Sequence, residues 1–125
     1  MSGTLRLSTL AHTWLIDLDG VVVRHNGHLE GGDALLPGVR DFWASIPAGD
    51  RIVLLSARDN TLKPAALAFL QTEGLRVDHA IFGLPKGERI LINDQKPGGL
   101  ETAVAVNLGR DAGLADTPIV LSHEL

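Results

Sequence analysis

Short segments that are almost entirely aliphatic recur along this chain, and segments with helical patterning separate them. Residues 13–18 read Thr-Trp-Leu-Ile-Asp-Leu, and residues 51–56 read Arg-Ile-Val-Leu-Leu-Ser. Residues 77–82 and 89–93 are shorter segments of the same kind. Near-continuous aliphatic segments are typical of parallel strands that are buried on both faces. Their alternation with helices predicts an α/β domain with a mainly parallel central sheet.

Two helices are expected between these strands. Pro37 suits the first turn of a helix. Apolar residues follow it at helical spacing, namely Val39, Phe42, Trp43 and Ile46. A second helix is expected over residues 62–73, with Thr61 as its N-cap and Gly74 as its stop.

The remaining segments contain turn signals and one ambiguous stretch. Asn26-Gly27 is a strong hairpin signal because a type I′ turn needs positive φ at both positions. Residues 21–30 are therefore expected to form a short β-hairpin flap. Residues 102–108 carry β-branched side chains that favour a fifth strand, and a helix over residues 100–112 is the alternative. Residues 119–121 are expected to form a last short strand.

The composition of the chain excludes several classes of protein. The 125 residues suit one compact domain over residues 1–125, with 45% hydrophobic and 21% charged residues. A net charge of −4 argues against nucleic acid or an acidic membrane as a partner. The absence of cysteine excludes disulfides and thiolate metal sites and fits a cytoplasmic location. No apolar run approaches the length of a membrane span, and no signal-peptide pattern is present.

Polar residues stand at the carboxyl ends of the expected strands, where parallel sheets place their sites. Asp17 and Asp19 close the first strand, and their i, i+2 spacing in an extended chain points both carboxylates the same way. Two such charges need a positive partner, and a divalent cation is the simplest one. Ser56 and Asp94 close two later strands, and Lys86 precedes the segment that ends at Asp94.

Four segments, in this order, resemble the motifs of the haloacid dehalogenase-like (HAD) superfamily of phosphatases. Ile16-Asp17-Leu18-Asp19-Gly20-Val21 resembles the first motif, and Val53-Leu54-Leu55-Ser56-Ala57-Arg58 resembles the second. Lys86 stands for the third motif, and Ile90-Leu91-Ile92-Asn93-Asp94 resembles the fourth. The resemblance covers residues 13 to about 108 and implies a Rossmann-like, three-layer domain.

The resemblance also implies a role for each motif residue. Asp17 would be the nucleophile that forms an aspartyl-phosphate, and Asp19 would act as general acid and then as general base. Mg²⁺ would be held by Asp17, by the main-chain carbonyl of Asp19 and by Asp94. Ser56 would donate to a phosphoryl oxygen, and Lys86 would neutralise charge in the transition state. The implied function is a Mg²⁺-dependent phosphohydrolase for a small phosphomonoester, with a sugar phosphate or related metabolite favoured.

Two features depart from the usual family pattern. Asn93 precedes Asp94, and Gln95 and Lys96 follow it, so the second acid of the fourth motif is missing. The gaps after the first motif and between the second and third motifs are too short for a cap domain. The expected enzyme is therefore capless, with a site open to solvent unless a second copy of the chain covers it.

Selectivity in a capless enzyme must come from the residues around the site. Arg24, His25 and His28 of the expected flap are candidate substrate contacts, and solvent-exposed turn residues are the alternative reading. Arg58 is a candidate contact to a substrate phosphate or carboxylate, with a surface arginine as its alternative.

Two other functions compete with the phosphohydrolase. A non-catalytic HAD-like binding protein would fit the missing second acid of the fourth motif. A receiver-type signalling domain would share the length, the paired acids and a late lysine. A receiver needs a phospho-accepting aspartate after its third strand, however, and residues 81–83 read Ile-Phe-Gly.

Overall fold

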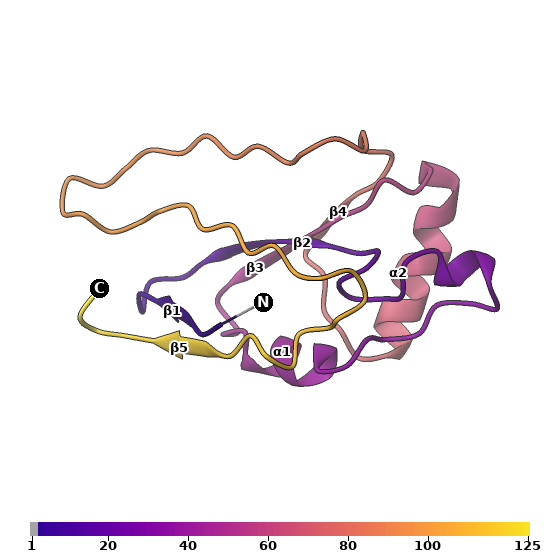
Figure 1. The fold of residues 1–125 in the computed structure, drawn as a ribbon, viewed down its shortest axis with the longest axis horizontal. Helices are drawn as coiled ribbons and strands as arrows, with labels where there is room; N and C mark the ends of the chain where they lie inside the picture. The colour runs from indigo at the N-terminus through magenta and orange to yellow at the C-terminus, as the bar shows by residue number, and fades with distance from the viewer. Residues whose placement is uncertain (1–2) are drawn as a thin grey trace.

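The computed structural model describes residues 3–125, which fold around a three-stranded parallel sheet (Figure 1). The strands are β1 (Leu5–Leu7), β2 (Thr13–Asp17), β3 (Arg51–Leu55), β4 (His79–Ile81) and β5 (Ile119–Leu121). The helices are α1 (Val39–Ser45) and α2 (Lys63–Thr72), with short 3₁₀ turns η1 (Gly27–Leu29) and η2 (Asn60–Leu62).

The central sheet has the order β2-β3-β4, and both strand pairs are parallel. Helix α1 connects β2 to β3, and α2 connects β3 to β4, so the chain makes two consecutive βαβ units. The register pairs Asp17 with Leu55 and Leu55 with Ile81, which aligns the carboxyl ends of the three strands. The predicted α/β class with a parallel sheet is confirmed, and the arrangement is compatible with a Rossmann-like domain.

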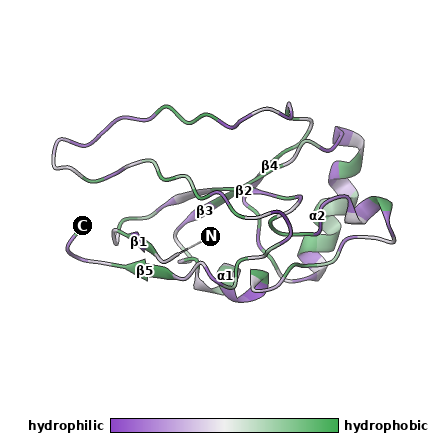
Figure 2. Cartoon of the chain, in the orientation of Figure 1, coloured by the Kyte–Doolittle hydropathy of each residue, from purple (hydrophilic) through white to green (hydrophobic). Residues whose placement is uncertain are grey.

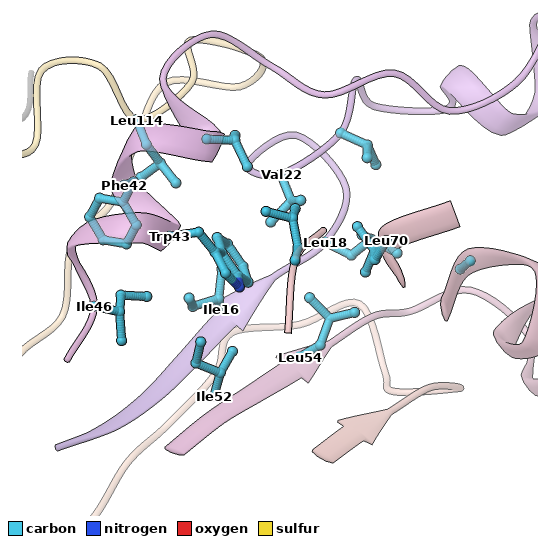
Figure 3. Packing of buried hydrophobic residues seen from close by; sticks show 14 of the residues in the cluster. Ile16, Leu18, Val22, Phe42, Trp43, Ile46, Ile52, Leu54, Leu70 and Leu114 are labelled. Atoms are coloured by element: carbon cyan, nitrogen blue, oxygen red, sulfur yellow. The ribbon is translucent and has the colours of Figure 1, made fainter. Parts of the chain in front are cut away.

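The core lies between one face of this sheet and the two helices. Ile52 and Leu54 of β3 are fully buried, and Figure 3 shows them on the same side as Trp43 of α1. The Trp43 indole Nε1 donates to the Arg76 carbonyl oxygen at 2.8 Å, which satisfies the one polar group of this buried ring. Leu70 of α2 extends the same cluster.

The opposite face of the sheet is much less covered. Leu15 on β2 is 51% exposed and Ile81 on β4 is 48% exposed. Residues 3–125 therefore supply one helical layer against the sheet, and the third layer of the expected three-layer arrangement is not formed there.

Local sequence accounts for the ends of both helices. Gly38 precedes α1 with φ of 78°, a conformation that favours glycine. The Asp59 side chain accepts a hydrogen bond from the Thr61 backbone N–H at 2.9 Å and caps η2, which runs directly into α2. The predicted N-cap at Thr61 is wrong, because Thr61 lies inside η2 and Leu62 is the N-cap of α2. Gly74, with φ of 79°, stops the helix as predicted.

The predicted β-hairpin over residues 21–30 is wrong. Val22 and Val23 are fully buried, and both of their backbone N–H groups donate to the Leu18 carbonyl oxygen, so the chain turns inward at once. Asn26 does adopt a left-handed conformation, with φ of 58°, but it leads into the 3₁₀ turn η1. Burial of the two valines outweighs the local Asn-Gly signal, and the expected flap is a compact loop.

Residues 83–109 form an extended arm without helix or strand. The strands expected over residues 89–93 and 102–108 are absent, and so is the alternative helix over residues 100–112. The arm runs out from the end of β4 and doubles back (Figure 1). The Asn93 side chain donates to the Thr102 carbonyl oxygen at 2.9 Å across the two limbs. A strand needs a hydrogen-bonded neighbour, and neither limb has one.

The C-terminal segment returns to the body of the protein. Leu114 is buried beside Phe42 of α1 (Figure 3), and its N–H donates to the Pro37 carbonyl oxygen at 2.9 Å. Strand β5, predicted from the sequence, pairs in parallel with β1, which was not predicted. Within residues 3–125, every helix is too short or too polar to cross a membrane.

Candidate functional site

The end of β2 delivers the two acids into a tight turn. The Leu18 N–H donates to the Leu55 carbonyl oxygen at 2.9 Å, which extends the parallel ladder by one residue beyond Asp17. Gly20 then takes φ of 85°, and its N–H donates to the Val23 carbonyl oxygen at 2.7 Å. This turn holds Asp19 toward the next strand, while the Asp17 side chain stays 44% exposed.

Asp19 is held by residues that follow β3, the neighbouring strand. The Arg58 guanidinium donates to Asp19 Oδ1 through Nη2 at 2.7 Å and through Nε at 3.1 Å. Ser56 Oγ donates to Asp19 Oδ2 at 3.4 Å and accepts the Arg58 N–H at 3.0 Å. The structure thus brings together four predicted site residues, namely Asp17, Asp19, Ser56 and Arg58.

Asp33 completes this network, although no pattern in the sequence singles it out. Arg58 donates to Asp33 through Nη1 at 2.9 Å and through Nη2 at 2.8 Å, and its side chain is only 4% exposed. Burial lowers the pKa of Arg58, but hydrogen bonds to Asp33 and Asp19 outweigh this effect and raise the pKa above its ordinary value. Arg58 is therefore a buried cation between two carboxylates, and the surface-arginine reading is wrong.

Asp17 has a different environment from Asp19. Its partial burial and the neighbouring Asp19 charge raise its pKa, against the opposing attraction of Arg89 and His25. Arg89 Nη2 lies 3.7 Å from Asp17 Oδ1. Arg89 was predicted only as the first residue of a strand. Its position next to the expected nucleophile was not predicted from the sequence.

The flap candidates lie in the loop that follows the acid pair. The His25 backbone N–H donates to Asp111 Oδ1 at 2.7 Å, which ties this loop to the C-terminal segment. Arg24 forms an ion pair with Glu30 at 2.9 Å. His28 and Arg58 both line one cavity.

Within the described residues, Lys86 and Asp94 form no hydrogen bond or ion pair with Asp17, Asp19 or Ser56. Both residues are exposed on the arm, and the Asp94 carbonyl oxygen accepts a hydrogen bond from the Thr102 hydroxyl of the returning limb. The sequence segment that resembles the fourth motif is therefore present, but it is not paired with β2 or β4.

The residues expected to hold Mg²⁺ are only partly assembled. The Asp17 carboxylate and the Asp19 carbonyl are oxygen donors of the kind that Mg²⁺ takes. The third expected ligand, Asp94, lies on the arm. Within residues 3–125, no group of three or more His, Cys, Asp and Glu side chains is placed to hold a metal ion. The expected three-ligand set does not fit this arrangement.

Comparison of the chain with protein-family models, curated proteins and solved structures gives no match in any of the three. The chemistry of the site therefore has to be inferred from the arrangement of its residues. A half-exposed carboxylate with a raised pKa lies two residues from a carboxylate that is held by a buried arginine and a serine hydroxyl. Two carboxylates in such different environments are suited to different tasks.

Proposed function

We propose that this protein is a HAD-like phosphohydrolase that cleaves a small phosphomonoester through an aspartyl-phosphate on Asp17. One observation carries the proposal. The aligned ends of β2 and β3 juxtapose the accessible Asp17 carboxylate with Asp19, which is held by Ser56 and Arg58. A nucleophile needs access to the substrate, and an acid–base group needs a fixed position beside it.

The reaction proceeds in two steps that use the two acids differently. An Asp17 oxygen attacks phosphorus, the phosphorus–oxygen ester bond breaks, and the leaving oxygen takes a proton from Asp19. The Asp19 carboxylate then takes a proton from water, whose oxygen attacks phosphorus and releases inorganic phosphate and free Asp17. Hydrogen bonds from Arg58 hold the Asp19 carboxyl group in one position for both steps.

Positive charge near Asp17 comes from the arm. Arg89, 3.7 Å from Asp17, offsets the repulsion between this carboxylate and an incoming phosphate dianion. We retain Mg²⁺ as the expected cofactor, and it would supply further charge of this kind when bound. The Asp17 carboxylate and the Asp19 carbonyl would be its protein ligands, without Asp94.

The test is phosphate release from phenyl phosphate in the presence of Mg²⁺ by the wild type and by Asp17→Asn. We expect kcat to fall by roughly 10³-fold or more in Asp17→Asn. The thermal midpoint should be unchanged or higher at pH 7, because the raised pKa of Asp17 means that its ionised form opposes folding.

The control is Asp41→Asn, which changes an exposed aspartate on α1 and should leave turnover unchanged. Retention of full activity in Asp17→Asn would refute the assigned mechanism. Omission of Mg²⁺ from the same assay tests the metal separately, since loss of activity without the ion supports the cofactor assignment.

A non-catalytic binding protein is the second candidate. The position of Lys86 and Asp94 favours it, since within residues 3–125 neither exposed residue bonds to Asp17 or Asp19. Binding of Mg²⁺ or of phosphorylated metabolites without turnover across a broad panel would support this candidate instead.

A further inference from the structure

A cavity of about 300 Å³ lies between the loop after the acid pair and helix α2. One wall is apolar and consists of side chains from η2 and α2, among them Leu62, Ala65 and Phe69. The other wall is polar and includes His28, Asp33 and Arg58. A mostly apolar hollow with a few polar groups on one side is the usual composition of a small-molecule site.

His28, which lines this wall, has an unused hydrogen-bonding group. Its Nδ1 atom is buried and has no hydrogen-bond partner within residues 3–125. A buried nitrogen without a hydrogen-bond partner destabilises the protein, so a ligand group that bonds to it would gain affinity. The atom donates or accepts according to the ring tautomer.

Arg58 joins the cavity to the acid pair. Arg58 lines the cavity, and its guanidinium donates to Asp19 Oδ1 at 2.7 Å. In the proposed reaction Asp19 protonates the ester oxygen, so the organic group bonded to that oxygen must begin next to Asp19. The cavity shares Arg58 and Asp33 with the network that holds Asp19, so an organic group bound there would lie on the Arg58 side of the acid pair.

We propose that this cavity binds the organic leaving group of the phosphomonoester, an inference that rests on the proposed function. The volume holds roughly ten water-sized groups, since a water molecule takes about 30 Å³ of liquid. The apolar wall would strip water from hydroxyl groups without replacing their hydrogen bonds. The favoured substrate class is therefore an aryl or compact alkyl phosphate with one hydrogen-bonding group that faces His28, and not a fully hydroxylated sugar phosphate.

The test measures binding without turnover, with Asp17→Asn as the parent protein and calorimetry as the readout. Ala65 is exposed on α2 and lines the cavity, so Ala65→Phe fills it from the outside. We expect Ala65→Phe to weaken phenyl phosphate binding by tenfold or more. Inorganic phosphate, which has no organic group, should bind the parent and the variant equally.

Ala68→Phe is the matched control, because Ala68 is exposed on the same helix and does not line the cavity. It should leave both dissociation constants within twofold. As a second variant, His28→Leu should remove the tighter binding of 3- or 4-hydroxyphenyl phosphate relative to phenyl phosphate.

Unchanged phenyl phosphate affinity in Ala65→Phe would overturn the assignment of the cavity. Equal affinity of the Asp17→Asn parent, which keeps His28, for phenyl phosphate and both hydroxylated esters would overturn the role of His28. Failure of the proposed hydrolysis is a different result, seen as absence of phosphate release by the wild type. The binding comparison remains decisive for the cavity in that case.

Discussion

At the scale of single residues, Arg58 organises the candidate site. Its side chain lies buried between Asp19 and Asp33 and hydrogen-bonds to both. Removal of one member of a buried ion network leaves an uncompensated charge, which typically costs 3–5 kcal/mol. The contribution of Arg58 to the site is therefore mainly to position Asp19, with Asp33 fixing the guanidinium from the other side.

Asp33→Ala should lower the free energy of unfolding by about 3 kcal/mol and reduce kcat more than it changes KM. The physical reason is that Arg58 loses its second carboxylate and no longer holds Asp19 in one position. Urea denaturation and steady-state kinetics measure the two effects. Asp41→Ala on α1 is the control, and a loss below 1 kcal/mol in Asp33→Ala would contradict the network.

Arg89→Gln should raise the pKa of Asp17 further, because the arginine charge opposes the effects of burial and of Asp19. The pKa can be followed by carboxyl NMR titration of the metal-free protein. Arg51→Gln removes an exposed arginine at the start of β3, at the opposite end of the pair from Asp17, and should leave this pKa unchanged. An unchanged pKa in Arg89→Gln would mean that the arm does not contact the site in solution.

At the scale of elements, two aliphatic segments of similar composition adopt different structures. Residues 51–55 form β3, which lies between β2 and β4 and is hydrogen-bonded on both sides. Residues 89–93 extend along the arm with Ile90 and Ile92 exposed by 82% and 91%. Figure 2 shows hydrophobic residues of this limb away from the sheet and helices. Aliphatic composition predicts a capacity for strand formation, whereas pairing depends on a neighbour.

Ile92→Asp should change the thermal midpoint by less than about 2 °C, because an exposed side chain contributes little to stability. Ile52→Asp should prevent folding, since Ile52 is fully buried in the core. Calorimetry or circular dichroism melts measure both. A large loss of stability in Ile92→Asp would show instead that residues 89–93 are packed as a strand.

At the scale of the whole molecule, the C-terminal segment closes the fold through backbone contacts. Gly38 and Gly113 lie where this segment meets the start of α1, and both have positive φ. A Cβ atom at Gly113 would lie 2.2 Å from the Pro37 carbonyl oxygen. Leu114, the next residue, packs on Phe42 (Figure 3). The close approach of Gly113 to Pro37 therefore holds the C-terminal segment against α1, although the two are far apart in the chain.

Gly113→Ala should destabilise the protein by at least about 2 kcal/mol, because it adds a clash with backbone to an unfavourable φ of 82°. Chemical denaturation measures the change. Gly98→Ala on the arm is the control, since a Cβ atom there meets nothing within 4 Å. Equal stability of the two variants would contradict the packing of the C-terminal segment on α1.

Local patterns in the sequence were sufficient for the βαβαβ core and for the acids at the end of β2. Buried strands and amphipathic helices produce patterns of apolar residues that can be recognised in a short stretch of sequence. Strands β2, β3, β4 and β5 lie within the segments predicted for them. The class of the fold and the position of Asp17, Asp19 and Ser56 at one sheet edge follow from the same patterns.

Contacts between distant residues required the folded chain. Arg58 and Asp33 are 25 residues apart and share no local pattern, so their pairing emerges only when β3 and the preceding loop pack together. The same reason explains why the hairpin prediction and the strand at residues 89–93 were wrong. Burial of Val22 and Val23 and the absence of a pairing partner for residues 89–93 are properties of the packed molecule, and short-range sequence patterns do not contain them.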